Sequence, residues 1–199
     1  MEEALKQKNI NIAKVVLYGP ESSGKTTLAK HLARHYNTVW APEYAREYLQ
    51  DKWNNNRETC KNSDLIPIAI GQMKLENELA QKADKLLICD TDLLVTKIYS
   101  EEYYGGYVHP DLEKAAISNK YDLYLLTYID TPWEEDDLRD KPDQRLEMFN
   151  AFEAGLKRHN RPYIILKGEK KDRLETAIFE IDKILKALPN LQSYPTKKK

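Results

Sequence analysis

The fold of this 199-residue chain follows from one stretch, Gly19-Pro20-Glu21-Ser22-Ser23-Gly24-Lys25-Thr26-Thr27. It fits the phosphate-binding loop (P-loop) pattern, in which two glycines five positions apart precede a Lys-Thr pair. Glycine lets the backbone curl so that successive N–H groups point inward and form a cradle for phosphate oxygens. We therefore expect every residue of the stretch except Pro20 to contact a nucleoside triphosphate, with ATP as the expected ligand.

The residues on either side of the P-loop support this interpretation. Residues 14–18 form a short apolar run typical of a strand, and residues 28–34 have the composition of a helix. Strand, loop and helix is the order that the motif requires, because the helix N-terminus adds its positive dipole end to the anion site. Lys25 is then predicted to reach the β- and γ-phosphates as a catalytic cation, and the Thr26 hydroxyl to bind Mg²⁺.

Charge and composition favour an enzyme that acts on small molecules. Lys plus Arg (31) nearly balance Asp plus Glu (32), so we expect neither a nucleic-acid partner nor insertion into a membrane. Residues 1–6 lack the apolar run of a signal peptide, and the two cysteines do not suggest a disulfide framework. The 13 tyrosines do not by themselves predict a base-stacking platform, because no basic groove accompanies them. A cytoplasmic location is the expectation.

Short apolar runs alternate with helical patterns along the chain. Five of these runs are predicted strands, at residues 14–18, 38–40, 85–90, 121–127 and 162–166. Right-handed crossovers would place them in one parallel sheet covered on both faces, a three-layer α/β sandwich of the P-loop, nucleoside-kinase-like type. We predict a single domain over residues 1–199, with its core at about 13–187 and polar ends at 1–12 and 190–199.

Ligands of such sheets bind beyond the carboxyl ends of the strands. Asp90 ends the third predicted strand and is expected to hold Mg²⁺ together with Thr26. The alternative is that Asp90 or Asp92 caps the helix that follows. Asp92 is expected either to face the substrate or to supply that cap.

Two further segments fall at the same edge of the sheet. Glu43 is predicted to accept a hydrogen bond from the acceptor hydroxyl and to take its proton, while Arg46, on the same helical face, helps to place the acceptor. The alternative is a surface Glu–Arg pair of little consequence. Residues 131–145 are predicted to form a lid in which Arg139 and Arg145 stabilise charge during transfer, the alternative being a solvated loop.

Several motifs together resemble those of a known family. They are the P-loop, Glu43-Tyr44-Ala45-Arg46-Glu47-Tyr48, Asp90-Thr91-Asp92, His109-Pro110, and Thr131-Pro132-Trp133 followed by Leu138-Arg139. From about Ala13 to about Gly168 the chain resembles the ribosylnicotinamide kinase domain of NadR-type proteins of NAD biosynthesis. That domain is a P-loop kinase related in architecture to deoxynucleoside and thymidylate kinases.

The resemblance implies a reaction and a set of substrate contacts. It implies transfer of the ATP γ-phosphate to the 5′-hydroxyl of nicotinamide riboside, with Mg²⁺, to give nicotinamide mononucleotide. The acceptor contacts would come from Glu43, Tyr44, Arg46, Asp92 and Trp133. In the family a Trp commonly precedes the first Glu of the Glu-Tyr-x-Arg motif, whereas Pro42 stands there in this chain. No part of the chain is expected to encode the adenylyltransferase or DNA-binding domains of multidomain NadR proteins.

Two other readings stay open from the sequence. A deoxynucleoside or nucleoside monophosphate kinase would share the same fold and the same phosphate site. A P-loop ATPase or nucleotide switch that acts on a protein partner would share the P-loop but would need no small acceptor. The oligomeric state also stays open.

Overall fold

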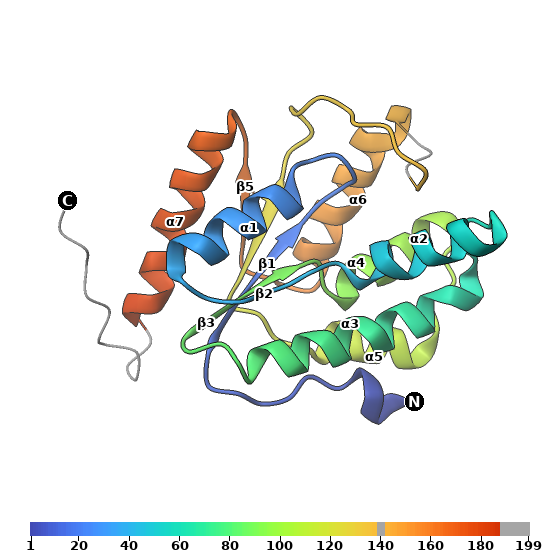
Figure 1. The fold of residues 1–199 in the computed structure, drawn as a ribbon, viewed down its shortest axis with the longest axis horizontal. Coiled ribbons are helices and arrows are strands. Elements are labelled where there is room, and N and C mark those ends of the chain that lie inside the picture. The colour runs from blue at the N-terminus through green and yellow to red at the C-terminus, as the bar shows by residue number, and fades with distance from the viewer. Residues whose placement is uncertain (139–141, 188–199) are drawn as a thin grey trace.

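A single parallel sheet lies at the centre of the computed structural model, which describes residues 1–138 and 142–187 (Figure 1). Its strands are paired in the order β2-β3-β1-β4-β5. Their bounds are Ala13–Tyr18 for β1, Trp40–Ala41 for β2, Leu86–Asp90 for β3, Leu123–Thr127 for β4 and Tyr163–Leu166 for β5. The predicted five-stranded parallel sheet is therefore confirmed. Arg139, one of the two predicted lid arginines, lies outside the described residues.

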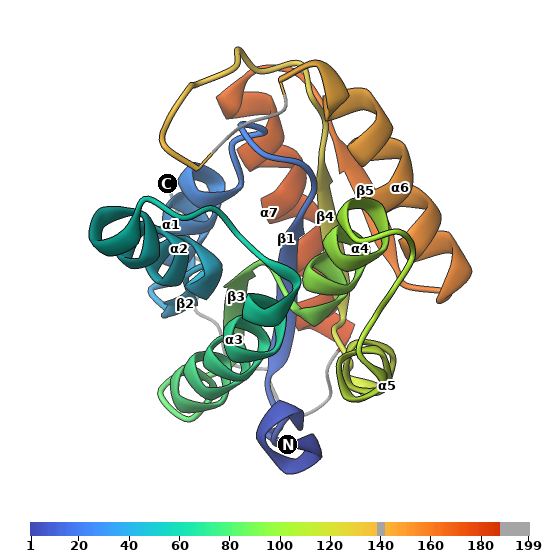
Figure 2. The ribbon, with the colours of Figure 1, turned by 90° about the vertical axis from the view of Figure 1, so that its right-hand side faces the viewer.

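Helices cover both faces of this sheet and complete the predicted three-layer sandwich (Figures 1 and 2). The long helices are α1 (Lys25–Tyr36), α2 (Tyr44–Asn56), α3 (Leu65–Ala80), α4 (Leu93–Tyr103), α5 (Pro110–Ser118), α6 (Arg145–Arg158) and α7 (Lys170–Ala187). Short 3-10 turns occur at η1 (Glu2–Leu5), η2 (Asn62–Asp64) and η3 (Pro142–Gln144). Side chains of α1 and α7 pack on one face of the sheet, and side chains of α4 and α6 pack on the other.

The central strand β1 shows why the sheet forms where it does. All six of its residues are buried, as expected for a strand covered on both faces. Val15 and Leu17 pack toward α1 and α7, whereas Val16 and Tyr18 pack toward α4 and α6. The Tyr18 ring makes an edge-to-face contact with Phe152 of α6 at a centroid distance of 4.9 Å. This alternation holds the P-loop, which follows Tyr18 directly, at the carboxyl edge of the sheet.

Residues 1–12, expected as a polar lead-in, pack against the domain. Leu5 is fully buried in a cluster with residues of α3 and α5. Gln7 Nε2 donates a hydrogen bond of 3.0 Å to Oε1 of Glu76, a carboxylate on α3 that is completely buried. The same carboxylate accepts hydrogen bonds from Lys14 Nζ at 3.2 Å and from the Tyr121 hydroxyl at 2.7 Å. A buried polar network therefore ties the N-terminal segment to α3 and to β1.

No helix within residues 1–138 and 142–187 is both long and apolar enough to span a bilayer.

The network around Glu76 leads to a stability prediction. Glu76→Leu should lower the free energy of unfolding by about 3–5 kcal/mol, because it leaves the buried Lys14 ammonium without its partner charge. The double variant Lys14→Met/Glu76→Leu should lose less than the single variant, since no uncompensated charge remains in the core. Urea unfolding of the three proteins measures both effects. A double variant that loses as much free energy of unfolding as Glu76→Leu, or more, would contradict this account.

Candidate active site

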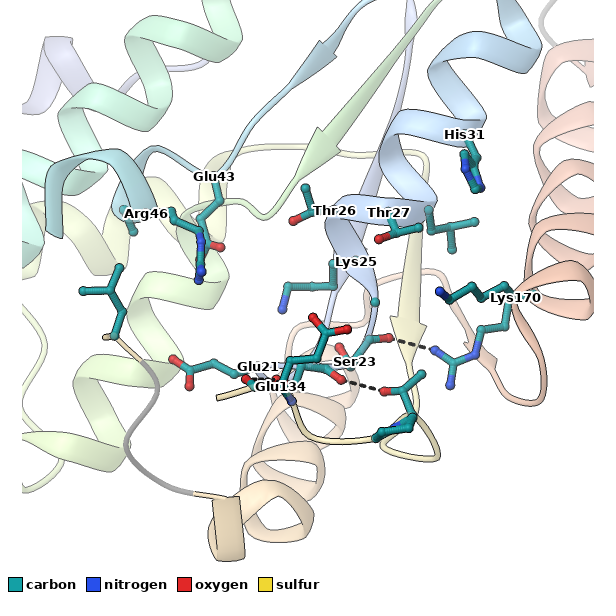
Figure 3. Close-up of a pocket in the computed structure, with 18 of the residues that line it drawn as sticks. Glu21, Ser23, Lys25, Thr26, Thr27, His31, Glu43, Arg46, Glu134 and Lys170 are labelled. Atoms are coloured by element: carbon teal, nitrogen blue, oxygen red, sulfur yellow. Dashed lines mark hydrogen bonds between the residues drawn. The ribbon is translucent and has the colours of Figure 1, made fainter. Parts of the chain in front are cut away.

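A cavity of about 440 Å³ lies over the carboxyl ends of the strands, where the sequence predicts the site. Figure 3 shows Glu43 and Arg46 entering it from one side and His31 and Lys170 lying toward the other. Residues from the P-loop, α1, α2, the segment after β4 and α7 line it: Glu21, Ser22, Ser23, Gly24, Lys25, Thr26, Thr27, Leu28, His31, Glu43, Ala45, Arg46, Leu49, Thr131, Pro132, Glu134, Leu138, Lys170 and Arg173. Segments that are far apart in the sequence thus meet at one site.

Gly19, the first residue of the P-loop, lies so close to Thr127 at the end of β4 that there is no room for a side chain. Gly19 has a φ of +137°, and a Cβ atom there would lie 2.8 Å from Thr127 Oγ1 and 2.9 Å from the Thr127 carbonyl oxygen. Ser23 Oγ donates to the Pro20 carbonyl at 2.6 Å and shares a 2.6 Å hydrogen bond with Thr127 Oγ1. Lys25 Nζ donates to the same Pro20 carbonyl at 2.9 Å. The catalytic lysine predicted from the motif therefore lies folded along the loop that would hold the phosphates.

Thr26 and Asp90, the predicted Mg²⁺ ligands, are in direct contact. Thr26 Oγ1 donates a hydrogen bond of 2.6 Å to Asp90 Oδ2. The other carboxylate oxygen, Oδ1, is buried and has no hydrogen-bond partner within the part of the chain that the structure describes. Burial, and next the negative charge of Glu43, raise the pKa of Asp90 to about 6. A cation beside Oδ1 would satisfy this oxygen, so the two side chains fit Mg²⁺.

The chain does not need a dedicated metal cage for such an ion. Within residues 1–138 and 142–187, no group of three or more His, Cys, Asp or Glu side chains is arranged to hold a metal. Mg²⁺ that binds together with a nucleotide typically takes one or two protein ligands and completes its shell with phosphate oxygens and water. One carboxylate and one hydroxyl at the end of β3 and the start of α1 meet that requirement.

Glu43 and Arg46 both line the cavity, but they differ in what they contact. Glu43 precedes α2, and its side chain makes no capping hydrogen bond to that helix. The Arg46 guanidinium forms an ion pair with Asp136 in the segment after β4. This ion pair links α2 to the predicted lid across the cavity. Glu43 thus lines the cavity without capping its helix, whereas Arg46 is paired with a residue of the predicted lid.

Arg145, predicted to stabilise charge during transfer, binds backbone carbonyls in this structure. Its Nη2 donates to the Ser22 carbonyl and its Nη1 to the Thr131 carbonyl, both at 3.0 Å. The Trp133 ring, predicted to contact the substrate, lies against this guanidinium at 5.8 Å from its centroid. Thr131 Oγ1 also donates to the Ser22 carbonyl at 2.6 Å. The first part of the predicted lid is therefore fastened to the P-loop.

Asp92 and Tyr44 were also predicted to contact the substrate. Neither residue lines this cavity or a smaller cavity of about 200 Å³ that adjoins it. Asp92 is buried, and its carboxylate accepts hydrogen bonds from the Val95 N–H at 3.1 Å and from the Tyr124 hydroxyl at 2.8 Å. Burial raises the pKa of Asp92 to about 7. These contacts match the helix-capping alternative. The Tyr44 ring packs on α3, where a Cβ atom at Gly71 would lie 2.0 Å from Tyr44 Cε1.

A second cavity of about 200 Å³ shares five lining residues with the first, which are Glu21, Glu43, Ala45, Leu49 and Leu138. The others are Thr59, Cys60, Leu65, Ile68, Gln72, Thr91, Val95, Thr96, Tyr99, Tyr103, Tyr104 and Asp137. Among the residues that the structure describes, the charged side chains that line it are three carboxylates, and no Lys, Arg or His does so. Burial, and next the charges of Glu21 and Glu43, raise the pKa of Tyr99 well above its ordinary value. Tyrosine rings and carboxylates thus share this cavity.

Sequence reasoning missed the three tyrosines of this second cavity. They lie at the C-terminal end of α4, the helix that follows Asp90-Thr91-Asp92. Tyr99 and Tyr103 are four positions apart, so they fall on one helical face, and their rings are in edge contact at 5.7 Å. Thr91, which precedes that helix, has a φ of +78°, an unusual conformation for a β-branched residue. The spacing of the tyrosines was a usable signal, but the sequence did not show which face met the site.

Gly19 and Gly105 make a matched pair for testing the P-loop. Both have positive φ, but a Cβ atom at Gly105 would meet nothing within 4 Å. Gly19→Ala should raise the Kd for ATP by ~10-fold or more, because the loop must move away from Thr127 and its N–H groups lose their common direction. Gly105→Ala should cost only backbone strain and leave the Kd for ATP unchanged. Isothermal titration measures both values, and equal affinities in the two variants would contradict the proposed geometry.

The chain matches the AAA domain family over residues 14–173. It is 34% identical over 125 residues to the trifunctional NAD biosynthesis/regulator protein NadR of Salmonella typhimurium, a match that covers 63% of this chain and 30% of that protein. The corresponding protein of Escherichia coli is 31% identical over 160 residues, which cover 79% of this chain and 39% of the relative. The chain thus spans well under half the length of the curated relatives it matches.

Solved structures share the fold. A crystal structure of a NadR protein in complex with NR has a TM-score of 0.71 at 23% identity and covers 94% of this chain and 54% of that one. A deoxyadenosine kinase from M. mycoides with bound dATP has a TM-score of 0.57 at 13% identity, covering 85% of this chain and 99% of that one. The expected α/β P-loop fold is thereby confirmed. Because the family match runs from β1 to the first turn of α7, the chain belongs to the AAA domain family and is a relative of the NadR proteins.

Proposed function

We propose that this protein is a kinase that transfers the γ-phosphate of ATP to the 5′-hydroxyl of nicotinamide riboside and so forms nicotinamide mononucleotide. One observation carries the proposal. The cavity beside the phosphate site is lined by three tyrosines and three carboxylates, and no basic side chain among residues 1–138 and 142–187 lines it. The relationship to NadR proteins, and the fold shared with a NadR protein in complex with NR, support the same acceptor.

The chemistry of this cavity suits a cationic aromatic ring. The pyridinium ring of nicotinamide riboside carries a positive charge, which the faces of Tyr99, Tyr103 and Tyr104 would attract. The carboxylates of Glu21 and Asp137 add negative potential to the same cavity. A nucleoside monophosphate would bring a phosphate group here, and phosphate groups are normally bound by Arg or Lys. The cavity therefore favours a nucleoside acceptor over a nucleotide.

Glu43 lines both cavities, so it lies between the expected positions of the donor phosphates and the acceptor. Its carboxylate would accept a hydrogen bond from the 5′-hydroxyl, orient the oxygen toward the γ-phosphorus and take the proton late in the transfer. Lys25 Nζ would exchange the Pro20 carbonyl for the β- and γ-phosphate oxygens. These two groups supply positioning and charge, which are the main contributions of an enzyme to phosphoryl transfer.

Thr26 and Asp90 would hold Mg²⁺ through the hydroxyl and the Oδ1 oxygen, which has no hydrogen-bond partner among the described residues. The bound ion would neutralise charge on the β- and γ-phosphates. The segment 131–138 would close the site, since Thr131 binds the P-loop and Asp136 pairs with Arg46. A closed site excludes water and protects ATP from hydrolysis before the acceptor arrives. An ATPase or switch that acts on a protein would not need a cavity for a small acceptor. We therefore consider that function the second candidate.

The proposed acceptor can be tested through the charge of its ring. We expect nicotinamide riboside to stimulate ADP formation from Mg·ATP, with nicotinamide mononucleotide as the product. Reduced nicotinamide riboside has nearly the same size but a neutral ring. Its kcat/KM should be lower by ~10-fold, since contacts of a cation with aromatic faces contribute on the order of 1 kcal/mol or more.

Other acceptors separate the remaining functions in the same assay. Thymidine, deoxycytidine and thymidine monophosphate serve as alternatives, each at the same concentration of Mg·ATP. A preference for a deoxynucleoside would keep the kinase and overturn the acceptor. ADP release that is indifferent to every acceptor would favour the ATPase or switch.

Glu43→Gln tests the proton acceptor. The variant should lower kcat by ~10²-fold or more, the usual scale for an acid–base group, because the amide cannot take the hydroxyl proton. The KM for ATP should stay nearly unchanged. Glu47→Gln is the matched control, since Glu47 is exposed one turn further along α2 and lines neither cavity. Steady-state kinetics of both variants decide the point, and an unchanged kcat in Glu43→Gln would remove Glu43 from the mechanism.

A further inference from the structure

We propose that Arg173, in the first turn of α7, is a positioning residue for the nucleotide site. It holds the Ser23 carbonyl of the P-loop turned away from the phosphate cradle. The inference deepens the proposed function and rests on the part of it that concerns ATP. It does not depend on which acceptor the enzyme uses.

One buried guanidinium joins three loops at the carboxyl edge of the sheet. Arg173 is only 5% exposed. Its Nη1 donates to the Ser23 carbonyl at 2.8 Å, its Nε to the Gly168 carbonyl at 2.9 Å and its Nη2 to the Tyr128 carbonyl at 3.1 Å. These carbonyls belong to the loops that follow β1, β5 and β4. Figure 3 labels Ser23 and, from the same helix as Arg173, Lys170, and it draws hydrogen bonds between the cavity residues as dashed lines.

Asp130 fixes the orientation of the guanidinium. The Asp130 carboxylate forms an ion pair with Arg173 Nη2, and its other oxygen accepts a hydrogen bond of 2.7 Å from the Gly168 N–H. Arg173, Asp130 and Gly168 thus form a closed ring of contacts. An arginine carries five N–H donors in a rigid, planar arrangement, and here that arrangement is held on one side by Asp130 and Gly168. The side chain therefore presents Nη1 to Ser23 in a fixed direction.

The direction of the Ser23 carbonyl matters for phosphate binding. A P-loop binds phosphate through N–H groups that point inward, so the carbonyls of the same residues must point outward. An outward carbonyl in a buried position needs a partner, because an unsatisfied one is costly. Arg173 supplies that partner for Ser23, and Arg145 supplies it for the preceding residue, Ser22. Two arginines, from helices that pack on opposite faces of the sheet, thus hold consecutive carbonyls of the loop.

Arg173 also lines the first cavity, but the role proposed for it is exerted through the loop. Four of its N–H groups are used by the three carbonyls and Asp130. In this proposal the phosphates are bound by the backbone N–H groups of the P-loop, and Arg173 keeps these groups oriented. Loss of Arg173 should therefore affect ATP and ADP alike, because the loop cradles the α- and β-phosphates that both share.

Nucleotide affinity of the full chain tests this role in the absence of any acceptor. Isothermal titration with Mg·ATP and Mg·ADP is performed on wild type, Arg173→Met, Arg173→Lys and Arg161→Met, together with thermal unfolding. Arg161 is the matched control. Its Nη2 donates to the carbonyls of Ala116 and Ile117 at 3.0 and 2.6 Å, and it lines neither cavity.

Arg173→Met is expected to raise the Kd for ATP and for ADP by ~10-fold or more, as for loss of a hydrogen bond from a charged donor. Arg173→Lys should recover part of the affinity, because an ammonium can still donate to the Ser23 carbonyl. Arg161→Met should lower the melting temperature while leaving both Kd values unchanged. A merely structural role of Arg173 would give the same pattern as Arg161→Met, and that result would overturn the proposal.

Two results separate this inference from the proposed function. Wild-type protein that binds neither ATP nor ADP would remove the nucleotide site and with it both proposals. Wild-type protein that binds ATP, with equal affinity in a folded Arg173→Met variant, would overturn the positioning role alone. Should Arg173→Met not fold, Asp130→Asn takes its place. It leaves the guanidinium without its fixing charge, and an unchanged Kd for ATP in that variant would also overturn the proposal.

Discussion

A phosphate cradle requires backbone N–H groups that point to one centre, and the rest of this structure serves that requirement. Gly19 lies so close to Thr127 that the loop begins in contact with β4. The Ser23 hydroxyl and the carbonyls of Ser22 and Ser23 are all bound from outside the loop. The sheet therefore does more than place the loop at its edge. Its neighbouring strands and helices decide which way each peptide group faces.

The two cavities share five lining residues but differ in the other charged groups that line them. Lys25 and the N-terminus of α1 provide positive potential in the first cavity. In the second cavity, the carboxylates of Glu21, Glu43 and Asp137 contribute negative potential around the tyrosines. Glu21 was expected as a nucleotide contact from its place in the P-loop, yet it lines both cavities. Under the proposed function, a carboxylate in this position would attract a cationic ring in the second cavity.

Residues at strand ends could be placed from the sequence because their positions follow from local rules. Apolar runs of strand length predict the sheet, and the carboxyl ends of parallel strands bring Thr26, Asp90 and Glu43 together. Roles that depend on where a side chain points were harder to assign. Asp92 follows the same strand as Asp90, but its carboxylate turns inward to Val95 and Tyr124. Asp90 and Asp92 are only two positions apart, yet their carboxylates have different partners because the backbone between them is irregular. The sequence does not predict this backbone conformation.

The sequence by itself determined the P-loop, the five strands and the carboxylates at the edge of the sheet, because each depends on residues close together in the chain. Only the tertiary structure decided which aromatic groups line the second cavity. Pro42 stands where the resembled family commonly has Trp, and tyrosines of α4 line the cavity instead. The structure also decided that Arg173 binds Ser23, 150 positions away. Such contacts form only when separate helices pack on the two faces of one sheet. No local sequence pattern predicts which residues of the helices and loops then come together.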